Sequence, residues 1–162
     1  MSISLIIQLL EKLLLLQKSL SKLAVHKTDI IKAGDVQALS SLMKEEQNHL
    51  QAIKQIESSL ISQVKKVIQP SVSSQLTLTN LVDMVNGPEK QVMKGLQSEL
   101  EEQMLILKNQ NELNQELLHQ SLQFINLSLD LLLPEIDSYN YESSDGVDTK
   151  PQSNRSLFDS KA

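Results

Sequence analysis

The sequence predicts an all-α protein: an elongated three-helix bundle in which an antiparallel helical hairpin packs with a longer third helix. A short connector helix and a disordered C-terminal tail complete this prediction. Gly and Pro each occur only four times in 162 residues, so few positions interrupt a helix. Aromatic residues make up 2% of the chain, so the core must be built from Leu and Ile. Apolar residues also recur with a period near 3.6 over long stretches, which is typical of amphipathic helices.

The hairpin is predicted from the residues that end and begin its helices. The first helix should run from Ser2 to Ala33, where Gly34 supplies the left-handed conformation that commonly ends helices. Asp35 can cap the second helix, which continues to about Ile68. So short a connection requires two antiparallel neighbours.

The connector and the third helix follow a polar linker at 71–75. Thr79 can cap a short helix that ends at Gly87, and Pro88 suits the first turn of the third helix. The third helix should end at Pro134, because proline cannot continue the backbone hydrogen bonding of a helix. Its direction relative to the hairpin is left open.

The composition changes after Leu133, so we predict a helical domain over 1–133 and a disordered acidic tail over 134–162. The tail nevertheless holds three of the four aromatic residues. We expect short docking segments at Tyr139, Tyr141, Leu157 and Phe158, and an inert solubilising tail is the alternative.

The C-terminal half of the third helix is too apolar for a helix packed on one side. Ten of the seventeen residues in 117–133 are Leu, Ile or Phe, whereas one packed face needs about three or four per two turns. The surplus indicates a second apolar partner and hence a protein that holds another protein. Asn111 and Asn114 lie on the same apolar stripe, where they could set the register of the bundle or face the backbone of a client.

Charge and composition exclude several function classes. A net charge of −5 with a pI near 5.2 argues against nucleic-acid binding. The absence of Cys excludes disulfides and thiol chemistry. No apolar run is long enough to insert into a membrane, and the N-terminus lacks the basic region of a signal peptide, so we expect a cytoplasmic protein. No nucleophile or phosphate-binding motif is present, so we expect no enzyme and no cofactor.

One pattern has the spacing of a metal site. Glu46 and His49, like Glu116 and His119, form the E-x-x-H pairs that di-iron helical bundles use. Such a site also needs one Glu from each of two further helices, so the pattern favours solvated surface residues and no metal.

The third helix carries a run that resembles the signature of the FlgN family of flagellar export chaperones. The run reads N-x-x-N-x-x-L-L-x-x-S-L-x-x-I and consists of Asn111, Asn114, Leu117, Leu118, Ser121, Leu122 and Ile125. The segments Leu76–Val82 and Ser156–Ala162 are also similar to family segments, the second to the ending of Gram-positive members. Lys65 and Lys66 depart from the family, which often has Arg there.

The resemblance implies a cytoplasmic chaperone of the flagellar type III export system. It would bind hook–filament junction (hook-associated) proteins through their C-terminal helices and deliver them to the export gate. The apolar surplus is compatible with a client helix lying in a groove. The expected client-binding residues are Asn111, Asn114, Leu117, Leu118, Ser121, Leu122, Phe124, Ile125, Leu129 and Leu131.

A different class of protein explains the same composition. In a self-associating coiled-coil scaffold or tether, the apolar surplus would form the interface of a homodimer and would have no role in export.

Overall fold

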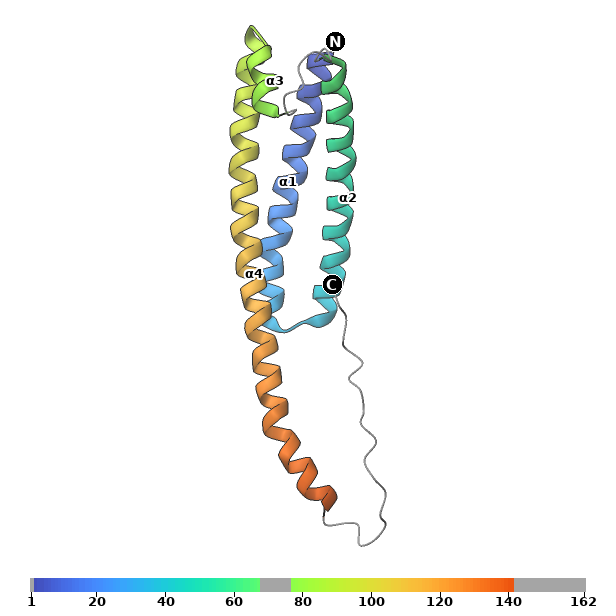
Figure 1. Ribbon diagram of the computed structural model, residues 1–162, viewed down its shortest axis with the longest axis vertical. Coiled ribbons are helices and arrows are strands. Elements are labelled where there is room, and N and C mark those ends of the chain that lie inside the picture. The colour runs from blue at the N-terminus through green and yellow to red at the C-terminus, as the bar shows by residue number, and fades with distance from the viewer. Residues whose placement is uncertain (1, 68–76, 142–162) are drawn as a thin grey trace. The chain divides into compact units, whose positions relative to one another are not determined.

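The computed structural model describes residues 2–67 and 77–141, with side chains over 3–67 and 77–133. Within these residues the chain is helical and contains no strand, so the predicted all-α class is confirmed. The helices, shown in Figure 1, are α1 (Ser2–Ala33), α2 (Val36–Val67), α3 (Leu78–Met84) and α4 (Pro88–Tyr141). The chain divides into two compact units, Met1–Ser121 and Leu122–Ala162, and α4 contributes to both.

The turn between α1 and α2 has the predicted chemistry. Gly34 adopts a φ of 70°, and its amide donates to the Ile31 carbonyl at 3.1 Å while the Asp35 amide donates to the Ile30 carbonyl at 3.3 Å. This pair of bonds is the Schellman motif that ends helices. The Asp35 carboxylate then accepts from the Ala38 amide at 2.9 Å and caps α2. The antiparallel hairpin is therefore fixed by two adjacent residues.

The connector helix begins two residues earlier than predicted. Thr77, and not Thr79, is its N-cap, because the Thr77 hydroxyl accepts from the Asn80 amide at 3.3 Å. The helix ends at Met84 and not at Gly87 as predicted, because Val85 is already extended. Either threonine has a side chain that can cap a helix. The helix that Thr77 caps buries Leu81 and Val82, which are 1% and 2% exposed. Pro88 opens α4 as predicted.

The main apolar core lies where α1 and α4 begin and α2 ends, and α3 closes it. Its largest fully buried side chains are Ile6, Leu10, Leu81 and Met93. The short connector helix is thus part of the core and joins the hairpin to α4 through apolar contacts.

The direction of α4, which the sequence leaves open, follows from its contacts with α1. Lys18 pairs with Glu99 at 3.0 Å, and further along both helices Thr28 bonds Asn114. Residue numbers increase together, so this part of α4 runs parallel to α1 and antiparallel to α2.

The predicted end of the last helix at Pro134 is wrong, because α4 continues to Tyr141. Proline removes one backbone donor and so leaves the Asp130 carbonyl without its helical partner, but later residues can still donate. A proline inside a helix often bends it instead of ending it. Accordingly, the first part of the predicted tail, 134–141, has a helical backbone. The rest of the predicted tail, 142–162, lies outside the described residues. None of the helices in the described ranges is long and apolar enough to cross a membrane.

Candidate functional site

A buried polar network joins α1 to α4 around Asn114, which is 3% exposed. The Asn114 amide nitrogen donates to the Ala24 carbonyl at 2.8 Å, and its oxygen accepts from the Thr28 hydroxyl. The same hydroxyl accepts from the Gln110 amide. A buried amide that is satisfied in this way holds one helix at one position along another. The structure therefore favours register control for Asn114.

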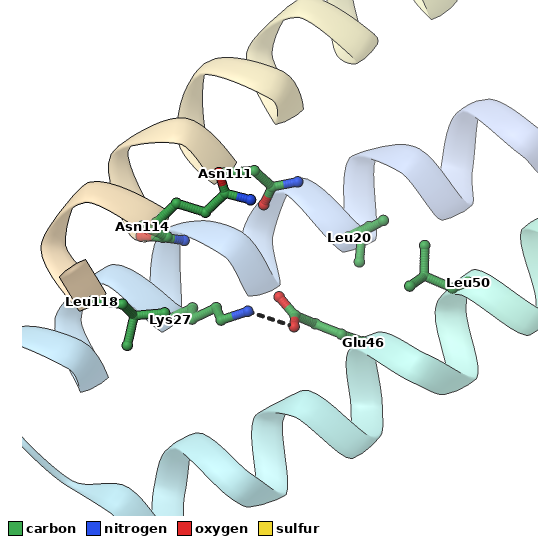
Figure 2. Close-up of a pocket in the computed structure, with 8 residues that line it drawn as sticks. Leu20, Lys27, Glu46, Leu50, Asn111, Asn114 and Leu118 are labelled. Carbon is green, nitrogen blue, oxygen red and sulfur yellow. Dashed lines mark hydrogen bonds and ion pairs between the residues drawn. The ribbon is translucent and has the colours of Figure 1, made fainter. Parts of the chain in front are cut away.

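Two polar links join α1 to α2. Figure 2 shows the ion pair between Lys27 and Glu46. Their Nζ and Oε2 atoms lie 2.9 Å apart, and the side chains are only 16% and 15% exposed. Ser19 lies within 2.8 Å of the His49 Nε2 atom, and His49 Nδ1 lies 2.9 Å from the Glu45 carbonyl. These contacts fix the pairing of the hairpin along its length.

These links also correct the interpretation of the first E-x-x-H pair as solvated surface. Glu46 and His49 are both partly buried and serve as links within the hairpin. In the second pair, Glu116 accepts from the Gln120 amide at 3.0 Å and His119 is exposed. Across the residues that the structure describes, no three His, Asp or Glu side chains form a potential metal cluster.

The Lys27–Glu46 pair borders a hollow of about 230 Å³ that all three long helices line. Its lining includes Leu20 of α1, Leu50 of α2, and Asn111, Asn114 and Leu118 of α4 (Figure 2). Two larger hollows follow in the direction of the α1 N-terminus. Both are lined by α1, α2 and α4, and the farther one also by Leu78 and Thr79 of α3. We call this row of hollows the furrow: α1 forms its floor, and α2 and α4 form its walls.

The structure separates the predicted client-binding residues into three groups. Asn114 is buried in the polar network and also lines the first hollow of the furrow. Asn111, exposed, and Leu118, half-buried, line the furrow, while Leu117 is half-buried and accepts at its carbonyl from the exposed Ser121 hydroxyl at 2.9 Å. The others belong to the second unit, and all of them are exposed: Leu122, Phe124, Ile125, Leu129 and Leu131.

The helix segment of the second unit exposes many more apolar side chains than is typical of a helix that faces water. Phe124 is 72% exposed and Leu131 is 76% exposed, so the sole aromatic side chain of the predicted helical domain is not in its core. The remaining exposed apolar side chains of this helix segment are Leu122, Ile125, Leu127, Leu129, Leu132 and Leu133. Exposed apolar side chains in such number are typical of interaction surfaces.

The predicted docking residues of the tail fall outside the described side chains. Tyr139 and Tyr141 belong to the helical backbone of α4, whereas Leu157 and Phe158 lie outside the described residues. Their role stays a prediction.

Sequence patterns did not reveal the furrow or the ion pair. Lys27 and Glu46 belong to different helices and have no common motif, and Gln17 on the furrow floor occurs in a Leu-rich stretch as one polar residue among several. Gln17 follows Leu10, Leu13 and Leu14 at helical spacing, so it is a polar residue on an apolar helix face. This position was the one sequence signal that pointed to the furrow.

Comparisons with known proteins agree with the resemblance. The family model described as FlgN protein matches residues 1–146. The uncharacterized protein YvyG of Bacillus subtilis (strain 168) is 34% identical over 162 residues, which is the full length of both chains. No solved structure matches. A family match over most of the chain establishes membership: the chain belongs to the FlgN family, whose members are flagellar export chaperones.

Proposed function

We propose that the protein acts in the cytoplasm, where it binds hook–filament junction proteins through their C-terminal helices and delivers them to the flagellar export gate. The observation that carries this proposal is the exposed apolar stretch of α4 from Leu122 to Leu133. An amphipathic client helix could cover this stretch, and covering it would keep both proteins from aggregating before export.

Two exposed side chains test the client-binding surface. Phe124→Asp and Leu131→Asp should each weaken binding of a junction-protein C-terminal segment about ten- to hundredfold, since one buried apolar side chain contributes about 1.5–3 kcal/mol. Both side chains are more than 70% exposed, so far-UV helicity should stay at the wild-type level. Asn126→Asp is the matched control, because Asn126 is exposed on the same helix and the change adds the same charge. Normal binding by both variants would place the client elsewhere.

The same apolar stretch also favours the second candidate function, a self-associating scaffold. Sedimentation of the protein alone and with a junction-protein segment separates the two. A homodimer that dissociates into a one-to-one complex supports the chaperone, whereas a dimer unaffected by the segment supports the scaffold.

The tail is tested by two truncations. Removal of the residues after Leu133 deletes both predicted docking pairs, whereas removal of those after Tyr141 deletes only Leu157 and Phe158. We expect at least one truncated protein to bind client in solution and to fail in export, because docking on the gate requires the tail. Unchanged export by both would contradict a docking role.

A further inference from the structure

The furrow is one continuous surface in the first unit. Its hollow of about 520 Å³ shares Leu20, Leu50, Asn111 and Gln115 with the hollow of Figure 2. The next hollow, about 430 Å³, is joined to it through Gln17 and Met104. From Leu10 to Lys27 along its floor the furrow spans roughly 25 Å at 1.5 Å per residue.

Gln17 stands at the point where the two larger hollows meet. It is 9% exposed, and its Oε1 atom is buried with no hydrogen-bond partner among the described residues. The neighbouring floor residues Leu10, Leu13 and Leu20 are apolar, so a leucine would fit the floor without leaving a polar atom unpaired. An unsatisfied buried amide in a folded protein calls for an explanation.

The middle of the furrow is polar on its wall as well as its floor. Asn111 and Gln115 of α4 line the same hollow as Gln17. Rotation of the Gln17 amide by 180° exchanges its oxygen and nitrogen without changing its shape, so it can present either a donor or an acceptor to the furrow. A neutral polar side chain, which can both donate and accept, therefore fits this place.

The end of the furrow beyond Gln17 indicates the charge of its occupant there, because the charged residues of the other two hollows form the ion pairs Lys108–Glu112 and Lys27–Glu46. Glu57 of α2 and Glu101 of α4 line opposite walls of the hollow that begins at Gln17. Apolar side chains such as Leu60 and Ile61 line the same hollow. A helix with an apolar stripe flanked by Lys or Arg complements this arrangement.

We propose that the furrow binds an amphipathic helix of the client, about 17 residues long, that completes a four-helix arrangement. This helix places an Asn, Gln, Ser or Thr within its apolar stripe against Gln17, and basic residues near Glu57 and Glu101. The proposal rests on the proposed function, because its occupant is a junction protein, but it assigns a surface separate from Leu122–Leu133.

The direction in which one substitution changes client affinity tests the polar contact. Gln17→Met keeps the length of the side chain and removes both hydrogen-bonding groups. If the client meets Gln17 with a polar side chain, binding of a fluorescently labelled junction-protein C-terminal segment should weaken about tenfold. Unchanged or tighter binding would overturn the proposal, because an apolar occupant gains from the change. Gln8→Met is the matched control, since Gln8 is exposed on the same helix.

A second pair of variants tests the furrow itself. Met104 and Leu105 are adjacent on α4 and 60% and 59% exposed, but only Met104 lines the two larger hollows. Met104→Asp should weaken client binding at least tenfold and Leu105→Asp should not. Equal effects would overturn the proposal.

The variants also separate this inference from the proposed function. If Leu131→Asp abolishes binding and Met104→Asp does not, the furrow proposal fails and the chaperone function stands. If the wild type binds no junction-protein segment, both fail. A free dimer that Met104→Asp dissociates would identify a second copy of the chain as the occupant and overturn the proposal.

Discussion

The Asn114 network predicts a measurable coupling between two side chains on different helices. Asn114→Ala removes the bonds to the Ala24 carbonyl and the Thr28 hydroxyl. At about 1 kcal/mol per bond, and with a small cavity added, the free energy of unfolding should fall by about 2–3 kcal/mol. The Thr28 hydroxyl lies 3.2 Å from the Ala24 carbonyl and can donate there instead, which limits the loss.

Thr28→Val removes the same Thr28–Asn114 bond from the other side. The change also removes the acceptor of the Gln110 amide, but the half-buried Gln110 side chain can turn to water. We therefore expect the free energy of unfolding to fall by about 1–2 kcal/mol. The double variant should lose about 1 kcal/mol less than the sum of the two single losses, because the shared bond is counted twice in that sum.

Urea unfolding followed by far-UV circular dichroism measures all three variants, with an unchanged m value as the sign that the unfolded state is comparable. Losses that add to within about 0.3 kcal/mol would refute the coupling. An Asn114→Leu variant with a raised urea midpoint would refute the stabilising role and leave only register control.

Three further stability predictions follow from the hairpin. Glu46→Leu should cost about 3–5 kcal/mol in urea unfolding, because it leaves the Lys27 charge buried without a partner, and the Lys27→Met, Glu46→Leu double variant should recover most of that loss. Gly34→Ala should lower stability by about 1–2 kcal/mol through its φ of 70° alone, since an added Cβ meets no atom within 4 Å. Asp35→Ala should cost about 0.5–2 kcal/mol by removing the cap of α2, and a thermal midpoint equal to wild type would contradict the role of the cap.

The local features of the fold were predictable because they depend on neighbouring residues. Gly34 and Asp35 specify the hairpin turn by their own backbone and side-chain chemistry, and Pro88 marks the start of α4. Pro134 misled the prediction of the last helix, because proline either ends a helix or bends it, and the choice depends on more than the dipeptide.

The direction of α4 and the furrow depend on contacts between distant segments. The Lys18–Glu99 and Thr28–Asn114 contacts join residues more than 80 positions apart, and neither pair has a spacing that a sequence pattern could show. For the candidate site, periodicity predicted the apolar surplus of α4. It did not show that Asn114 is buried and Asn111 exposed, because residues three positions apart can lie on opposite borders of one packed face.

Asn114 and Gln17 are two buried amides that differ in their hydrogen bonds. Both carry an amide, both are at most 9% exposed, and both lie among apolar side chains of the same bundle. The Asn114 amide uses its oxygen and its nitrogen within the fold, so the fold itself explains an amide at this position, which serves the register of α4 on α1. The Gln17 oxygen has no partner among the described residues, so the hydrogen bonds of this part of the chain give no reason for an amide at this position. If binding supplies that reason, Asn114→Ala should lower stability more than client affinity, and Gln17→Met should lower client affinity without lowering stability. A Gln17→Met variant that loses stability and keeps its client affinity would show that both amides serve the fold.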